Sequence, residues 1–209
     1  MNRELRTWNR NFEPEPGTGN RERGTAAVRA VLLVLLAVWT WRFGAHALDA
    51  EAIMGSFLHL VNLPFHEAGH VLFSPFGALM MSLGGSLLQV IVPVVCAVAL
   101  ARKPDVFGAA VATWWAGQSL ADLAPYIADA RALQLVLLGG ATGAEVEGHD
   151  WEAILLSLGW LHRDRQLGMT AHVLGTLTMA ASLAVAGWIA WRDQRKSTSQ
   201  TLPRTSPYS

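Results

Sequence analysis

The sequence predicts an all-α, polytopic membrane protein with four to six membrane segments. Of its 209 residues, 52% are hydrophobic and only 15% are charged, whereas an ordinary soluble domain carries about 25% charged residues. The net charge is zero, but six of the sixteen basic residues lie in the first 29 positions and four follow Trp191. Long apolar runs between charged ends are typical of an integral membrane protein. No basic face suited to nucleic acid is evident, so we expect no nucleic-acid partner.

Three regions follow from these patterns. Residues 1–24 are polar and rich in Arg, Glu, Gly and Pro, and we expect a disordered leader there. Residues 25–191 are expected to form the membrane-embedded domain. Residues 192–209 are rich in Ser, Thr and Pro, and we expect them to form a disordered cytoplasmic tail. The single cysteine, Cys96, lies in an apolar run and is expected to be an inert packing residue.

Five apolar segments are expected within the membrane domain. Their approximate ranges are 25–48, 53–73, 83–101, 106–128 and 169–191. In the first, Trp39 and Trp41 suit an interfacial belt, although Ala45-His46-Ala47 also fits the cleavage site of a secretory signal. The region 131–165 is mixed and interrupted by several glycines, which are typical of loops.

Basic residues indicate the orientation. The leader, the tail and the pair Arg102-Lys103 all favour the cytoplasm, which requires an even number of crossings. Five apolar segments would give an odd number of crossings. A re-entrant loop near residues 74–85, which enters the membrane without crossing it, would make the number of crossings even. Irregular backbone at that depth must be buried in protein or line a wet cavity. We therefore expect both termini on the cytoplasmic side.

The second segment contains the H-E-x-x-H motif His66-Glu67-Ala68-Gly69-His70. On a helix this spacing puts two imidazoles about one turn apart on one face, which suits two ligands of a tetrahedral zinc ion. At about 100° per residue, four polar residues fall within an arc of about 80°: His59, Asn62, His66 and His70. Glu67 lies about 100° from His66, which suits a general base that is not itself a ligand. The alternative is a set of core histidines satisfied by neighbouring helices.

Two imidazoles need a third ligand, for which a carboxylate is the best candidate. Asp150 precedes the apolar stretch 153–158, where it would equally serve as the N-cap of a helix. On the fourth segment, four residues share a face of about 60°: Gln118, Asp122, Pro125 and Asp129. Asp122 and Asp129 would otherwise line a polar cavity or pair with Arg131.

At these residues the chain resembles the site-2 protease family of intramembrane zinc metalloproteases, and within it a bacterial-type branch. The resemblance covers about residues 57–160 and is most specific at residues 66–70. That family has a third ligand, an Asp at the start of a later helix, often in an N-x-x-P…L-D-G context. Asp122-Leu123-Ala124-Pro125 resembles the N-x-x-P element, and Gly84-Gly85 resembles the family's re-entrant, substrate-presenting loop. The chain has neither an intact L-D-G nor an inserted peptide-binding domain.

The resemblance implies one zinc ion per chain, held by His66, His70 and Asp150, with Asp129 as the alternative third ligand. It also implies Glu67 as the catalytic base. Substrate positioning would fall to a further group: Asp122, Pro125, Gly84 and Gly85. The expected activity is hydrolysis of a peptide bond of a membrane-protein substrate within or near the lipid bilayer, by a multi-pass protein of the bacterial plasma membrane. The alternatives are a non-proteolytic zinc-binding or ion-transporting membrane protein, and a degenerate protease that acts as a binding partner.

Overall fold

The computed structural model describes residues 18–146 and 148–201, and every regular element in these ranges is helical. The long helices are α2 (Thr18–Ala45), α4 (Phe57–Phe73), α5 (Ala78–Arg102), α6 (Val106–Asp122) and α9 (Asp164–Thr201). The short helices are α3 (Ala50–Met54), α7 (Ala124–Ala128), α8 (Asp150–Ser157), and the 3₁₀ helices η1 (Ser74–Phe76) and η2 (Leu161–Arg163). An isolated antiparallel bridge joins Val136 and Thr142 in the loop between α7 and α8. The all-α prediction is thus confirmed for the described residues.

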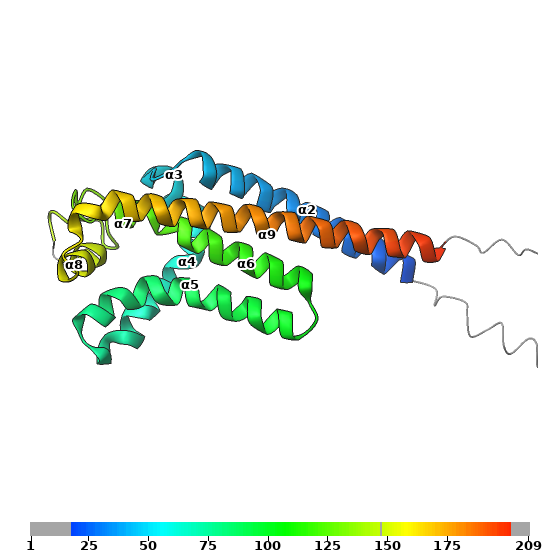
Figure 1. Cartoon of the computed structure of the whole chain (residues 1–209), viewed down its shortest axis with the longest axis horizontal. Coiled ribbons are helices and arrows are strands. Elements are labelled where there is room, and N and C mark those ends of the chain that lie inside the picture. Colours follow the sequence, from blue (N-terminus) through cyan, green and yellow to red (C-terminus); the bar gives the residue numbers. More distant parts are fainter. Residues whose placement is uncertain (1–17, 147, 202–209) are drawn as a thin grey trace, which may run out of the picture.

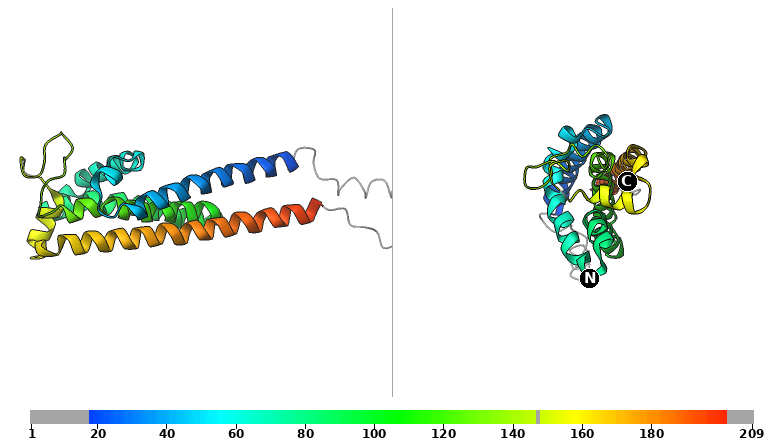
Figure 2. Two further views of the ribbon diagram at one scale, coloured as in Figure 1. Left: turned by 90° about the horizontal axis from the view of Figure 1, so that it is seen from above. Right: turned by 90° about the vertical axis from the view of Figure 1, so that its left-hand side faces the viewer.

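The long helices form an elongated bundle (Figures 1 and 2). Helices α2 and α6 pack along α9, and α5 packs on the other side of α6 (Figure 1). Arg29 on α2 donates a hydrogen bond to Asp193 on α9 at 3.0 Å. The start of α2 and the end of α9 therefore lie at one end of the bundle, as an even number of crossings requires. Helix α8 and the loop before it lie at the opposite end (Figure 1).

Three helical stretches are long and apolar enough to cross a membrane: Arg23–Ala45, Ala78–Arg102 and Leu161–Ser197. Their number is smaller than the four to six segments predicted. Helices α4 and α6 have 17 residues each, so they are about 26 Å long, short of a hydrocarbon core of about 30 Å. The predicted segment 106–128 is also divided, because α6 ends at Asp122 and α7 begins at Ala124.

The outward face of α2 is apolar. Five of its aliphatic side chains are each more than half exposed: Val28, Val31, Val34, Leu35 and Val38. A contiguous exposed apolar surface of this kind is typical of contact with lipid or with another protein. It agrees with the length and composition of the three candidate spans.

Glycines determine how closely the helices approach. A Cβ added to Gly175 on α9 would lie 2.6 Å from the carbonyl oxygen of Gly117 on α6. Helices α4 and α5 meet in the same way, since a Cβ on Gly69 or on Gly84 would strike the carbonyl oxygen of the other residue. Small residues allow such direct backbone contact between membrane helices. The second contact holds α5 directly against the helix that carries the H-E-x-x-H motif.

The re-entrant loop predicted near residues 74–85 is wrong. Helix α4 is joined to α5 by the single turn η1, and α5 runs without interruption from Ala78 through Gly84 and Gly85. Gly77, with φ at 96°, lies in a conformation that glycine adopts without strain and allows the chain to reverse. The glycine pair thus serves a helix–helix contact and not a loop.

The two ends of the described chain are helical for longer than the sequence predicts. Helix α2 already begins at Thr18, within the region expected to be a disordered leader, and α9 continues to Thr201, within the region expected to be a disordered tail. The rest of those two predictions falls on residues 1–17 and 202–209, which lie outside the described residues.

Candidate metal centre

Helix α4 presents the two imidazoles of the motif. Ser56 caps the start of the helix by accepting a hydrogen bond from the backbone amide of His59 at 3.2 Å. The rings of His66 and His70 lie one turn apart, with their centroids separated by 4.9 Å. His66 is buried and His70 is partly exposed. The helical spacing thus brings both rings to one face.

Asp150 reaches these rings from the first residue of α8. The residue that caps α8 is His149, whose Nδ1 accepts a hydrogen bond from the Glu152 amide at 3.2 Å. The alternative role of Asp150 as a helix cap is therefore wrong. Its Oδ2 instead lies 3.5 Å from His66 Nε2 and 3.3 Å from His70 Nε2, and the ligand atoms of the three residues all lie within 4.8 Å of one another.

This arrangement fits a zinc ion. Two ligands that are each about 2.1 Å from a tetrahedral metal lie about 3.4 Å apart, close to both imidazole–carboxylate distances. A Cβ added at Gly85 would lie 2.6 Å from His66 Nε2 and 2.7 Å from His70 Nε2, so the space beside both nitrogens is open only because residue 85 is glycine. Two imidazoles and one carboxylate are also the protein ligands of a known type of catalytic zinc site.

Each of the three residues is oriented by a further contact. The Nδ1–H of His66 donates to Gln89 Oε1 at 3.0 Å, and the Nδ1–H of His70 donates to the Met81 carbonyl oxygen at 2.9 Å. In the neutral form of each imidazole the single hydrogen is then on Nδ1, which leaves the lone pair of Nε2 for a metal. The Tyr126 hydroxyl donates to Asp150 Oδ2 at 3.1 Å and accepts from the Asp150 amide at 3.0 Å. Metal ligands in proteins are typically held by such outer hydrogen bonds.

The charge on Asp150 is also suited to a cation. Burial raises the pKa of the Asp150 carboxyl, but its interactions with His66 and His70 outweigh burial and lower that pKa to about 2. The carboxylate is therefore ionised at neutral pH, as a metal ligand must be. Burial lowers the pKa of His149, which favours the neutral imidazole that accepts the capping hydrogen bond.

A cavity of about 850 Å³ opens beside the three residues, and Glu67 lines it with them. Within the part of the chain that the structure describes, the Glu67 carboxylate has no hydrogen-bond or ion-pair partner. Such a carboxylate is available to take a proton from water. Much of the remaining wall is apolar: Met54, Leu63, Met81, Leu123, Leu137 and Leu156.

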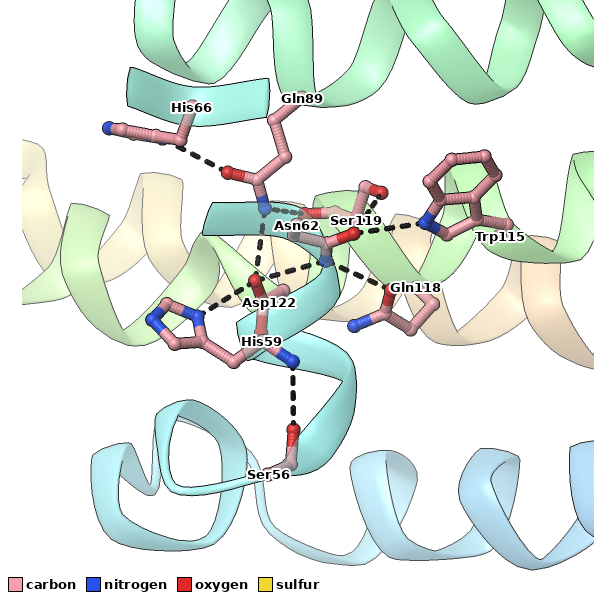
Figure 3. Close-up of polar contacts among 9 residues, drawn as sticks. All are labelled: Ser56, His59, Asn62, His66, Gln89, Trp115, Gln118, Ser119 and Asp122. Atoms are coloured by element: carbon pink, nitrogen blue, oxygen red, sulfur yellow. Dashed lines mark hydrogen bonds and ion pairs between the residues drawn. The ribbon is translucent and has the colours of Figure 1, made fainter. Parts of the chain in front are cut away.

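A buried polar network lies behind the imidazoles, between α4, α5 and α6 (Figure 3). Its centre is Asp122, whose Oδ2 accepts hydrogen bonds from three side chains: His59 (3.0 Å), Asn62 (3.1 Å) and Gln89 (3.0 Å). Asn62 also donates to Gln118 at 3.0 Å and accepts from the Trp115 indole at 2.9 Å. Asp122 borders the cavity, but its side chain is only 1% exposed.

The structure places Asp129 outside the group of three. Its carboxylate oxygens accept hydrogen bonds from the backbone amides of Gln134 and Leu135 at 3.0 and 2.9 Å, which fixes the loop after α7. Of the two alternative roles given for Asp122 and Asp129, the ion pair with Arg131 is not formed, because Arg131 donates to Asp164 at 3.0 and 3.2 Å.

The predicted substrate-positioning residues are dispersed. Pro125 is buried in the first turn of α7, directly before Tyr126. Gly84 lies in the α4–α5 contact and Gly85 lies against the two imidazoles. Gly84 therefore packs between α4 and α5, and Gly85 lies beside the candidate metal ligands.

Two side chains of this centre, Gln89 and Tyr126, were not singled out from the sequence. Gln89 had a detectable signal, since it is the only amide side chain in the aliphatic segment 83–101, and a polar residue in such a segment indicates a function. Tyr126 follows Pro125 without a distinctive pattern. The Met81 carbonyl is a backbone group, for which no side-chain signal exists.

Comparison with models of protein families, with curated proteins and with solved structures finds no match.

Proposed function

We propose that this chain is a membrane-embedded zinc metallopeptidase that hydrolyses peptide bonds of membrane-protein substrates within or near the bilayer. One observation carries the proposal: His66, His70 and Asp150 bring three ligand atoms within 4.8 Å of one another, and Glu67 lines the same cavity. The resemblance of residues 66–70 to the site-2 protease family agrees with this function.

The residues divide the chemistry between them. His66, His70 and Asp150 would hold the zinc ion, which when bound polarises a carbonyl group and makes water more acidic. Glu67 would accept the proton of the attacking water, because its carboxylate lies beside the ligand residues and is not held by any described group. The apolar wall of the cavity suits the side chains of a membrane segment.

We also propose that the protein lies in the membrane with both termini on one side. Three helices long and apolar enough to cross a membrane support a multi-pass protein of the bacterial plasma membrane. The basic residues at both ends of the chain support both termini in the cytoplasm, which requires that one shorter helix also crosses; α6, packed against both α5 and α9, is the candidate. Within the bilayer, water would reach the ligands only through the cavity that they line.

The test combines zinc content and cleavage. The full chain is purified in detergent, its zinc is measured, and it is assayed in liposomes against a panel of helical membrane substrates. The wild type is expected to hold about one zinc ion per chain, and His66→Ala to lose it. Glu67→Gln is expected to keep zinc but to lose about 10²–10⁴-fold in cleavage rate, the usual contribution of a general base.

Glu51→Gln provides the matched control, since Glu51 is an exposed carboxylate on α3. It is expected to leave zinc content and cleavage unchanged. Full cleavage by Glu67→Gln would contradict the assigned base, and a wild type without zinc would contradict the proposed function as a whole.

A second candidate function is ion transport, and the buried network around Asp122 is the observation that favours it. Polar side chains that link three helices inside an apolar bundle are also found along ion pathways. Ion flux into liposomes that depends on Asp122, with no cleavage of any substrate, would favour this reading. Zinc and substrate binding without cleavage would instead indicate a degenerate protease that acts as a binding partner.

A further inference from the structure

Helix α5 buries one amide side chain, Gln89, between a candidate metal ligand and a buried carboxylate. Gln89 is 3% exposed and lies in an otherwise aliphatic stretch of the helix. Its Oε1 faces His66 Nδ1 at 3.0 Å, and its Nε2 faces Asp122 Oδ2 at 3.0 Å (Figure 3). The amide therefore bridges the imidazole and the carboxylate.

The orientation of this amide is determined by its surroundings. Gln89 Nε2 donates to Asp122 Oδ2 and, at 3.3 Å, to the backbone carbonyl oxygen of Ser119. Both partners are acceptors, so the opposite orientation would place Gln89 Oε1 against two oxygens in a buried site. The amide oxygen must then face His66, and His66 must carry its hydrogen on Nδ1.

The carboxylate is itself firmly held. Asp122 Oδ2 also accepts hydrogen bonds from His59 and Asn62, so three donors converge on one oxygen. In known metal sites a carboxylate often bonds directly to the ligating histidine and increases its basicity. Here one amide group separates the carboxylate from the histidine, and hydrogen bonds in series polarise one another.

We infer that Gln89 is a positioning residue that, held by Asp122, fixes the His66 tautomer with Nε2 facing the metal and thereby increases the zinc affinity of the site. The inference rests on the proposed function, because it concerns the same zinc ion. Gln89 does not touch that ion, and it acts through His66.

Gln89→Leu removes the amide while keeping a side chain of similar size. Outer contacts of metal ligands typically change metal affinity by about 10–100-fold, so we expect zinc affinity, measured against a competing chelator in detergent, to fall by that factor. The control is Gln166→Leu. Gln166 is the same residue type, and its side chain is exposed on α9, outside the network around Asp122, so the zinc affinity of this variant is expected to stay within about twofold.

A second measurement uses only the zinc-loaded wild type and does not depend on a variant folding. The ¹⁵N chemical shifts of the His66 ring are expected to show hydrogen on Nδ1 and metal on Nε2. Metal on Nδ1 would overturn the inference, as would unchanged zinc affinity in Gln89→Leu or an equal loss in both leucine variants. Those results would not contradict the proposed function, whereas a wild type that binds no zinc would overturn both the inference and the proposed function.

Discussion

Replacement of Gly85 by alanine is the sharpest test of the candidate metal centre, because it adds one methyl group at a known place. The new Cβ would lie 2.6 Å from His66 Nε2 and 2.7 Å from both Cε1 and Nε2 of His70. Side-chain carbons essentially never approach other heavy atoms closer than 3.0 Å. Helix α5 has little room to retreat, because its backbone is in direct contact with α4 at Gly69 and Gly84.

The imidazoles must therefore turn away, and their metal-facing nitrogens turn with them. Loss of an outer contact typically costs about 10–100-fold in metal affinity, and displacement of the ligands themselves should cost more. We expect Gly85→Ala to weaken zinc binding by at least about 100-fold, which corresponds to about 2.8 kcal/mol. The assay is a titration of the purified protein in detergent against a zinc chelator of known affinity, with thermal unfolding followed in parallel.

Gly187→Ala is the matched control. Gly187 lies within α9, and a Cβ there would meet nothing within 4 Å, so zinc affinity should not change. Helix propensity alone favours alanine over glycine by about 1 kcal/mol, so neither change should weaken its helix for that reason. A folded Gly85→Ala protein that binds zinc as tightly as the wild type would refute the placement of Gly85 against the two imidazoles.

Three further outcomes are expected. Asp150→Ala should abolish zinc binding, whereas Asp129→Ala should retain it and loosen the loop after α7. A zinc titration in which Asp129→Ala loses more affinity than Asp150→Ala would make Asp129 the third ligand. Tyr126→Phe removes the hydroxyl partner of Asp150, so we expect zinc to bind about tenfold more weakly and the free energy of unfolding to fall by about 1–3 kcal/mol. If neither value changes, Tyr126 does not support Asp150. Reporter fusions should place both termini in the cytoplasm, since the Arg29–Asp193 pair holds the two ends together; reporters on opposite faces would contradict this topology.

The local part of the centre could be predicted from the sequence. Residues four apart on a helix share a face because of the helical repeat, so His66 and His70 were expected to lie together before any tertiary contact was known. The same holds for the apolar stretches, whose lengths and compositions indicated helices able to cross a membrane. Fewer such helices are found than predicted, because residues 53–73 are divided between α3 and α4, and residues 106–128 between α6 and α7.

Long-range contacts determined the rest. Asp150 is 84 positions from His66, and the sequence favoured it over Asp129 only because it precedes an apolar helix start, as the third ligand does in the family that the chain resembles. Asp129 binds its own loop instead. Gly84-Gly85 likewise has the same sequence whether it forms a loop or a close helix contact. Side-chain periodicity is a property of a few neighbouring residues, and it specified the helices and the spacing of the motif. Only the packing of α5, α7 and α8 around α4 decided which carboxylate, amide and hydroxyl surround the two imidazoles, because those positions depend on the whole chain.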